Sequence, residues 1–231
     1  MDLNKEPAWT EPENAKMKLS GTEVHLWEIL SSTDYAENLG AAEKQRYARI
    51  TNEDAKISYC TAQGGLRRVL NYYTGKPEGE MMLEREERGK PYITGGPEFN
   101  LSHTTGRVFA AYSSLPVGLD VESASRGVHA ESLARRFFLK DEVGHILSQL
   151  PPERAKMFLR YWVCKEAMVK LTGDGIYIGL QEAHVKLEKT GGARGFYKGR
   201  EVWIQEFSPG KDLLAALATW QPVEVKCFFR I

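Results

Sequence analysis

The stretch VGLDVE at residues 117–122 alternates aliphatic side chains with small or acidic ones. Side chains alternate between the two faces of a β-strand, so this pattern predicts a strand whose aliphatic residues face a core. Asp120 and Glu122 then share the other face, and Gly118 leaves that face open beside them. A half-buried strand with a polar outer face gives the same pattern, so the stretch alone does not identify a site.

The two carboxylates of this strand have a spacing that suits a metal ion. Cα atoms two residues apart along a strand are separated by about 7 Å. Asp120 and Glu122 can therefore converge on one hard cation between them. Ligands that offer only oxygen suit magnesium, which takes few carboxylates and completes its shell with water and substrate phosphate.

A second set of polar residues lies on a long helix that is expected to run from Pro151–Pro152 to about Thr172. Trp162, Glu166 and Lys170 recur at every fourth position, so they lie along one stripe of the helix. Glu166 before Lys170 is the favourable order for a surface ion pair. The alternative is that Glu166 completes a metal site while Lys170 meets a phosphate. Cys164 and Lys165 point elsewhere on the helix.

Two loops and a basic helical region supply further candidates. Gly89-Lys90-Pro91 is a turn that presents a lysine, and Ser102-His103 follows a short apolar strand. A hydroxyl and an imidazole at a strand end can donate to a phosphate. The helical region 41–73 carries a cluster of basic residues, one or two of which could hold a terminal phosphate. The spacing does not select among its members, Lys44, Arg46, Arg49 and Lys56.

The remaining pattern predicts a mixture of helices and strands. Asn52 is the expected N-cap of the second helix, with Thr51 as its rival, and Gly75 ends that region. Residues 108–113 and 117–122 are expected to form a hairpin. Strands are also expected at 23–30, 81–85, 99–102 and in the segment from 176 onward, and helices at 41–50, 53–73, 130–138 and 141–150.

Composition excludes several classes of function. The 231 residues include 31 basic and 31 acidic side chains, so a broad nucleic-acid-binding field is not expected. Three scattered cysteines fit reduced thiols, and no apolar run approaches the ~20 residues of a membrane span. The polar N-terminus lacks the apolar core of a signal peptide, which favours a cytoplasmic protein. Dinucleotide, P-loop, zinc-protease and nucleophile-elbow motifs are all missing from the sequence.

Taken together, the motifs resemble those of the Sfp-type 4′-phosphopantetheinyl transferases. That family carries GKP, FNxSH, (I/V)G(I/V)D(I/V)E and W(S/C/T)xKEAxxK in this order. The sequence has them at 89–91, 99–103, 117–122 and 162–170, with Leu119 in place of the commoner isoleucine or valine. Arg136-Phe137-Phe138 with Glu142 is also similar to the family's RFF…E segment.

The resemblance implies an α+β fold of two similar α/β halves, related by a pseudo-twofold axis, with the active site in the cleft between them. We expect an N-terminal extension at 1–22, an N-terminal half at 23–115 and a C-terminal half at 116–231. The implied activity is the magnesium-dependent transfer of 4′-phosphopantetheine from coenzyme A to a serine of an acyl or peptidyl carrier protein, with release of 3′,5′-ADP. A monomer that binds neither nucleic acid nor membrane is expected.

The resemblance also implies a role for each motif residue. Glu166 is the candidate base for the serine proton, directly or through water. The implied magnesium ligands, shared with the pyrophosphate, are Asp120, Glu122 and Glu166, and the implied pyrophosphate contact is Lys170. The implied contacts of the coenzyme A phosphates are Ser102 and His103. The implied nucleotide site is lined by Lys90 and Pro91, and the 3′-phosphate would lie near Arg49 or Lys56.

Two other functions use the same residues. A magnesium-dependent phosphohydrolase acting on a nucleotide-like pyrophosphate would use the same three carboxylates. A non-catalytic binding module could keep the fold as a scaffold. The presence of Asp120, Glu122, Glu166 and Lys170 together favours an enzyme.

Overall fold

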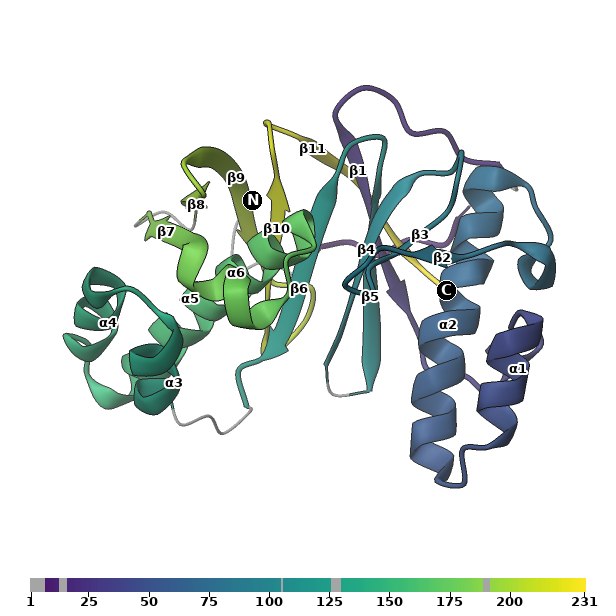
Figure 1. Cartoon of the computed structure of the whole chain (residues 1–231), viewed down its shortest axis with the longest axis horizontal. Coiled ribbons are helices and arrows are strands. Elements are labelled where there is room, and N and C mark those ends of the chain that lie inside the picture. The colour runs from purple at the N-terminus through teal and green to yellow at the C-terminus, as the bar shows by residue number, and fades with distance from the viewer. Residues whose placement is uncertain (1–6, 13–15, 105, 126–129, 189–191) are drawn as a thin grey trace. The chain divides into compact units, whose positions relative to one another are not determined.

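The structure is a computed structural model, and it describes residues 7–12, 16–104, 106–125, 130–188 and 192–231. Contacts divide the chain into two units (Figure 1). The N-terminal unit comprises Ala8–Leu115 with Val223–Ile231, and the C-terminal unit comprises Pro116–Pro222. The expected extension at 1–22 lies partly outside the described residues, which lack 1–6 and 13–15.

The N-terminal unit contains a four-stranded sheet in the order β11-β1-β5-β4 and a two-stranded ladder of β2 and β3. The long helix α2 packs on β1 and β5, and α1 lies beside α2 (Figure 1). The elements are β1 Glu23–Ile29, the 3-10 turn η1 Asp34–Ala36, α1 Ala41–Ala48, α2 Glu53–Thr74, the 3-10 turn η2 Glu78–Glu80, β2 Glu84–Arg85, β3 Pro91–Tyr92, β4 Glu98–Thr104, β5 Arg107–Ser113 and β11 Glu224–Arg230.

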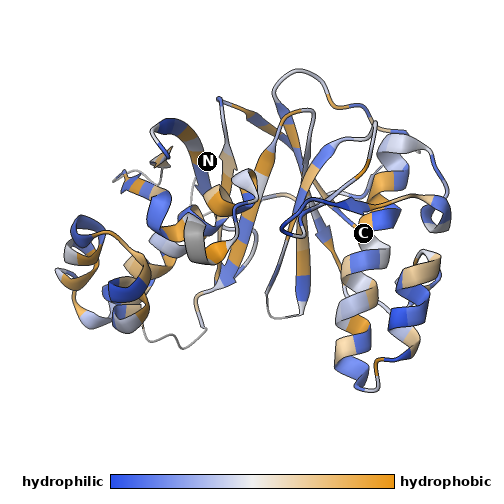
Figure 2. Ribbon diagram, in the orientation of Figure 1, coloured by the Kyte–Doolittle hydropathy of each residue, from blue (hydrophilic) through white to orange (hydrophobic). Residues whose placement is uncertain are grey.

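Local signals fix the ends of α2. The Asn52 side chain accepts a hydrogen bond from the Ala55 backbone N–H at 2.8 Å, which confirms Asn52 as the N-cap. Gly75 ends the helix with a φ of 67°, a conformation that costs glycine little. Hydrophobic and hydrophilic residues alternate along α2 in Figure 2, as expected of a helix with one buried face. That face packs around Trp27 of β1 in the core of the unit.

The last strand of the chain belongs to the N-terminal unit. β11 pairs in parallel with β1, so residues 223–231 lie in the sheet of the first half of the sequence rather than with 116–222. On the other edge of β11, the Thr10 backbone N–H donates to the Phe228 carbonyl at 2.9 Å. Trp9 packs against Phe109 and Phe228. The described part of the extension therefore covers the edge of this sheet.

The C-terminal unit contains a five-stranded antiparallel sheet in the order β6-β10-β9-β8-β7. Helix α5 packs on all five strands, while α3 and α4 pack beside α5 (Figure 1). The elements are β6 Val117–Ser123, α3 Ala130–Phe137, α4 Lys140–Leu147, α5 Pro151–Thr172, α6 Ile176–Glu182, β7 Ala183–Leu187, β8 Gly192–Tyr197, β9 Arg200–Phe207 and β10 Leu213–Thr219.

The α+β class is confirmed, and so are the helices expected at 41–50, 53–73, 130–138, 141–150 and from 151 to 172. The hairpin of 108–113 with 117–122 is wrong, because β5 pairs with β1 and β4 whereas β6 pairs with β10. The expectation of strands from 176 onward is wrong for α6. None of the helices that the structure describes combines the length and the apolar character that a membrane span requires.

Candidate active site

The site in the C-terminal unit is built where α5 crosses β6. A Cβ atom at Gly118 would lie 2.0 Å from the Ala167 carbonyl oxygen and 2.5 Å from the Leu171 backbone nitrogen. Only glycine permits so close an approach. The expectation that Gly118 leaves its face of the strand open is therefore wrong, since the backbone of α5 fills that space. This contact brings Glu166 and Lys170 of α5 next to Asp120 and Glu122 of β6.

Asp120 and Lys170 meet across this contact. The Lys170 ammonium nitrogen donates to Asp120 Oδ1 at 2.7 Å. The Asp120 side chain is 6% exposed and the Lys170 side chain 27%, so the pair lies at the rim of a buried region. Lys170 thus reaches the strand, in addition to following Glu166 along the helix.

Glu166 is a buried carboxyl with an unusual affinity for protons. Its pKa is raised to about 7, mainly by burial and next by the negative charge of Asp120, while Glu122 adds to the shift and Lys170 opposes it. The four residues that were expected to act together are therefore close enough to influence one another. Among the residues that the structure describes, no three histidine, cysteine, aspartate or glutamate side chains are grouped closely enough to hold a metal ion.

The other residues of the motif on α5 pack inside the unit. Trp162 contacts the rings of Phe137, Phe138 and Phe158. Lys165 and Cys164 are completely buried, and the Lys165 ammonium group donates to the Leu180 carbonyl. The expectation that Lys165 points away from Glu166 and Lys170 is confirmed, and Trp162 is a packing residue.

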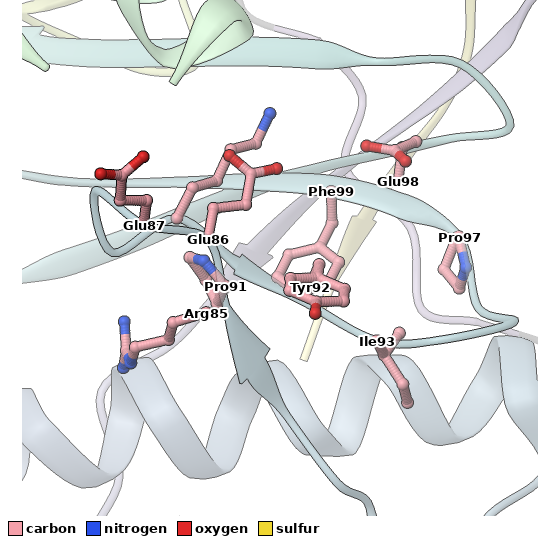
Figure 3. Close-up of a pocket in the computed structure, with 10 residues that line it drawn as sticks. Arg85, Glu86, Glu87, Pro91, Tyr92, Ile93, Pro97, Glu98 and Phe99 are labelled. Atoms are coloured by element: carbon pink, nitrogen blue, oxygen red, sulfur yellow. The ribbon is translucent and has the colours of Figure 1, made fainter. Parts of the chain in front are cut away.

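Lys90 and Pro91 line a pocket of about 410 Å³ in the N-terminal unit. Figure 3 shows the carboxylates of Glu86 and Glu98 on the same side of this pocket, above the ring of Tyr92. Burial lowers the pKa of Lys90, and those two carboxylates oppose the shift. The pocket combines an ammonium group with aromatic rings, a lining that can accept a planar group carrying polar edges.

The remaining candidates lie on β4, α1 and α2 of the same unit. Ser102 is buried and His103 is exposed, because neighbouring residues of a strand face opposite sides. Arg49 is exposed at the end of α1. Lys56 pairs with Glu53 at 3.1 Å in the first turn of α2 and lies 6.0 Å from the ring centroid of Tyr47.

Sequence reasoning missed the carboxylates and rings around Lys90. The signal that could have revealed them is the two-stranded ladder around the GKP turn, in which Arg85 pairs with Pro91 and Glu84 with Tyr92. Residues that flank a short turn symmetrically are brought to the same place by strand pairing. A strand was expected at 81–85, but β2 is only two residues long. The expected strand therefore did not reveal how β2 pairs with β3.

Comparison with known proteins assigns the chain to a family. A model described as the 4′-phosphopantetheinyl transferase superfamily matches residues 116–218. The 4′-phosphopantetheinyl transferase HetI of Nostoc sp. is 34% identical over 229 residues, which cover 91% of this chain and 95% of that protein. The chain belongs to the 4′-phosphopantetheinyl transferase superfamily.

Further relatives of this transferase match over shorter stretches. The 4′-phosphopantetheinyl transferase psf-1 of Bacillus pumilus is 35% identical over 130 residues, 55% of each chain. The 4′-phosphopantetheinyl transferase Sfp of Bacillus subtilis is 30% identical over 128 residues, 54% of this chain and 56% of that protein. These matches confirm the resemblance drawn from the four motifs, and with it the enzyme class, a 4′-phosphopantetheinyl transferase.

Proposed function

We propose that this transferase moves the 4′-phosphopantetheine group of coenzyme A to a serine hydroxyl of an acyl or peptidyl carrier protein. The serine Oγ forms a bond to the β-phosphorus of coenzyme A, and the bond from that phosphorus to the oxygen of 3′,5′-ADP breaks. The observation that carries the proposal is the packing of α5 on β6, which brings Glu166 and Lys170 beside Asp120.

We assign magnesium to Asp120, Glu122 and Glu166. Their donors are carboxylate oxygens only, which suits this ion. The raised pKa of Glu166 supports the assignment: burial is its main cause, the negative charges of Asp120 and Glu122 add to it, and a divalent cation would relieve that crowding of charge. A preformed cage of three ligands is not required, since magnesium usually takes one or two carboxylates together with water and substrate phosphates. When bound, magnesium would neutralise charge that builds on the pyrophosphate oxygens.

Lys170 is the residue of the protein that we expect to place a positive charge beside the reacting phosphate. Its ammonium group is held by Asp120 and its side chain is partly exposed, so it can reach a phosphate oxygen without leaving the site. An ammonium group fixed beside the reacting phosphate stabilises the charge that develops during transfer. We expect Lys170 to orient the pyrophosphate and to hold it in line with the incoming hydroxyl.

Glu166 is our candidate for the base that accepts the serine proton, directly or through a water molecule. A base works best when its pKa lies near the working pH, and the pKa of Glu166 is about 7 before a cation binds. A bound cation would lower this pKa. Transfer through water therefore suits Glu166 better than direct contact.

Coenzyme A binding is the proposed task of the residues in the N-terminal unit. The pocket around Lys90 and Pro91 supports a nucleotide site, since it offers an ammonium group and aromatic surface. Ser102 and His103 remain the proposed phosphate contacts, and Arg49 or Lys56 the neighbours of the 3′-phosphate. A cleft between two similar halves stays part of the proposal, as do a cytoplasmic location and a monomer.

Mass spectrometry of carrier proteins tests this function. A small panel of apo acyl and peptidyl carrier proteins is incubated with the enzyme, coenzyme A and magnesium. We expect at least one carrier to gain the mass of one phosphopantetheinyl group, and no gain when magnesium is chelated. Coenzyme A incubated without a carrier should stay intact. Release of phosphopantetheine in that control would indicate a phosphohydrolase instead.

A further inference from the structure

The ammonium group of Lys165 is completely buried, although its neighbour Glu166 belongs to the polar stripe. Lys165 Nζ lies 2.8 Å from Glu142 Oε2 and donates to the Leu180 carbonyl at 3.0 Å. It also donates to the Ala183 carbonyl and lies 5.0 Å from the ring centroid of Phe138. The charge therefore has a complete set of partners inside the unit and does not face the phosphate site.

Glu142 extends this set of contacts to two more backbone positions. Its Oε2 accepts from the Leu139 N–H and its Oε1 from the Val185 N–H, both at 2.9 Å. β7 is an edge strand of the sheet; Lys165 donates to its Ala183 carbonyl, and Glu142 accepts from its Val185 N–H. The pair therefore satisfies two backbone groups of this edge strand and joins α5 to α4 and β7.

A buried ion pair of this kind is costly to form. Its attraction repays the loss of hydration only when the geometry is good and the remaining donors and acceptors are bonded, as they are here. Well-packed apolar side chains would give similar or greater stability. What the pair adds over apolar packing is a fixed set of hydrogen-bond directions between α5 and its neighbours.

These directions constrain how α5 sits against β6. Consecutive residues of a helix differ by about 100° around its axis, so fixing Lys165 also fixes the direction of Glu166. The close contact of Gly118 with Ala167 holds the same part of α5 from the side of β6. The helix is thus held from two directions at the turn that carries Glu166.

We infer that Lys165 is a positioning residue of the transfer reaction. By joining α5 to α4 and β7, it sets the rotation of α5 and so the place of Glu166 and Lys170 beside Asp120. The inference rests on the proposed roles of Glu166 and Lys170. It also separates the two lysines of the motif, since Lys170 acts on substrate while Lys165 acts only through the helix.

The same helix offers a matched control in Arg160 and Glu206. Arg160 donates to both carboxylate oxygens of Glu206, at 2.8 and 2.6 Å, and the Glu206 side chain is fully buried. This pair joins α5 to β9 and lies almost two turns before Glu166. Breaking it should destabilise the unit without turning the part of the helix that carries Glu166.

Steady-state kinetics of Lys165→Met and Arg160→Met test the inference, with coenzyme A, magnesium and the carrier that the wild type modifies. Small misplacements of reacting groups cost about 10- to 100-fold in rate, so kcat of Lys165→Met should fall by that factor. KM for coenzyme A should change by less than about threefold, since the residue does not touch substrate. Arg160→Met should keep kcat within about twofold while losing a comparable amount of Tm, because it breaks a similar buried pair. Unchanged kcat in Lys165→Met, or an equal loss in Arg160→Met, would overturn the inference.

Lys165→Met leaves Glu142 as a buried carboxylate without its ammonium partner, which could prevent folding. The double variant Lys165→Met with Glu142→Gln removes both charges and keeps one acceptor for the Leu139 and Val185 N–H groups, so it should fold, with kcat still reduced. Amide hydrogen exchange supplies a readout that does not depend on activity. Exchange in the turn around Glu166 should accelerate in the double variant and not in Arg160→Met, whereas equal rates would contradict the inference. If the wild type modifies no carrier, the proposed function fails, and the exchange result still decides whether Lys165 holds the turn of α5 that carries Glu166.

Discussion

Glu166 holds its proton more tightly in the folded chain than in the unfolded one. Its pKa is about 7 in the folded chain, above the usual 4.5 of a glutamate, chiefly because of burial and with added contributions from Asp120 and Glu122. The stability that this group contributes is therefore fully present below its unfolded pKa and is lost as the pH rises through about 7. At higher pH the ionised carboxylate destabilises the fold unless a cation accompanies it.

Magnesium should consequently stabilise the enzyme more at pH 8 than at pH 6. At pH 6 a bound ion must displace the proton of Glu166, whereas at pH 8 it meets a carboxylate that is already ionised. Thermal unfolding with and without magnesium at the two pH values measures the difference. Glu166→Gln cannot ionise, so its magnesium effect should be smaller and similar at both pH values. An equal magnesium effect at pH 6 and pH 8 in the wild type would exclude Glu166 as a ligand.

Lys90→Ala should weaken coenzyme A binding and leave the chemical step nearly unchanged. Lys90 lines the pocket of the N-terminal unit, and loss of a contact made equally in the ground and transition states raises KM alone. We expect KM for coenzyme A to rise about tenfold, the size of one charge-assisted hydrogen bond. Lys76→Ala on the exposed surface of the same unit is the control. A loss confined to kcat would place Lys90 in the chemical step instead.

The contact between β6 and α5 tolerates little change. Gly118→Ala would place a methyl group 2.0 Å from the Ala167 carbonyl oxygen, which belongs to rigid helix backbone. We expect a loss of about 1–3 kcal/mol in the free energy of unfolding, or more, from this overpacking, with a loss of activity as α5 shifts. Urea denaturation measures the first effect and carrier modification the second.

Gly144→Ala in α4 provides the comparison. An added Cβ there would meet no described atom within 4 Å, and alanine is a better helix former than glycine. This variant should gain about 0.5–1 kcal/mol. Equal stabilities of Gly118→Ala and the wild type would show that α5 moves freely over β6.

The sequence predicts the helices of this fold better than the pairing of its strands. The ends of α2 depend on Asn52 and Gly75, which act on their own neighbours and are visible as residue types. The hairpin of 108–113 with 117–122 failed because strand partners are chosen by packing far along the chain. Alternation in 117–122 correctly predicted which residues share a face, but it could not show that a helix covers that face at Gly118.

For the whole molecule, the sheet of the N-terminal unit depends on the last residues of the chain. β11 pairs with β1, and the ring of Phe229 lies 4.7 Å from that of Trp27 in the core. Deleting residues 223–231 removes that strand and exposes Trp27. We expect the N-terminal unit to unfold and to be cleaved by protease, whereas the C-terminal unit has its own sheet and core.

Limited proteolysis followed by mass spectrometry identifies which unit is lost. Lys226→Ala is the control, because Lys226 is exposed and its ion pair with Glu23 contributes little to stability. Uniform resistance of the truncated chain would show that β11 is dispensable. The sequence divides the chain near residue 115, but it carries no local signal that 223–231 return to β1, since that pairing joins residues about 200 positions apart.

Carrier modification by Lys170→Met tests whether the ammonium group beside Asp120 acts in phosphopantetheinyl transfer. The intact mass of an apo carrier protein is followed over time with coenzyme A, magnesium and the wild type, Lys170→Met or Lys198→Met. Lys198 also pairs with an aspartate, Asp174, but on the surface of the same unit. The wild type and Lys198→Met should add one phosphopantetheinyl group at similar rates. Lys170→Met should be slower by about 100-fold or more while staying folded at the assay temperature, with a lower Tm because the buried Asp120 loses its partner. A Lys170→Met rate equal to that of the wild type would contradict the account.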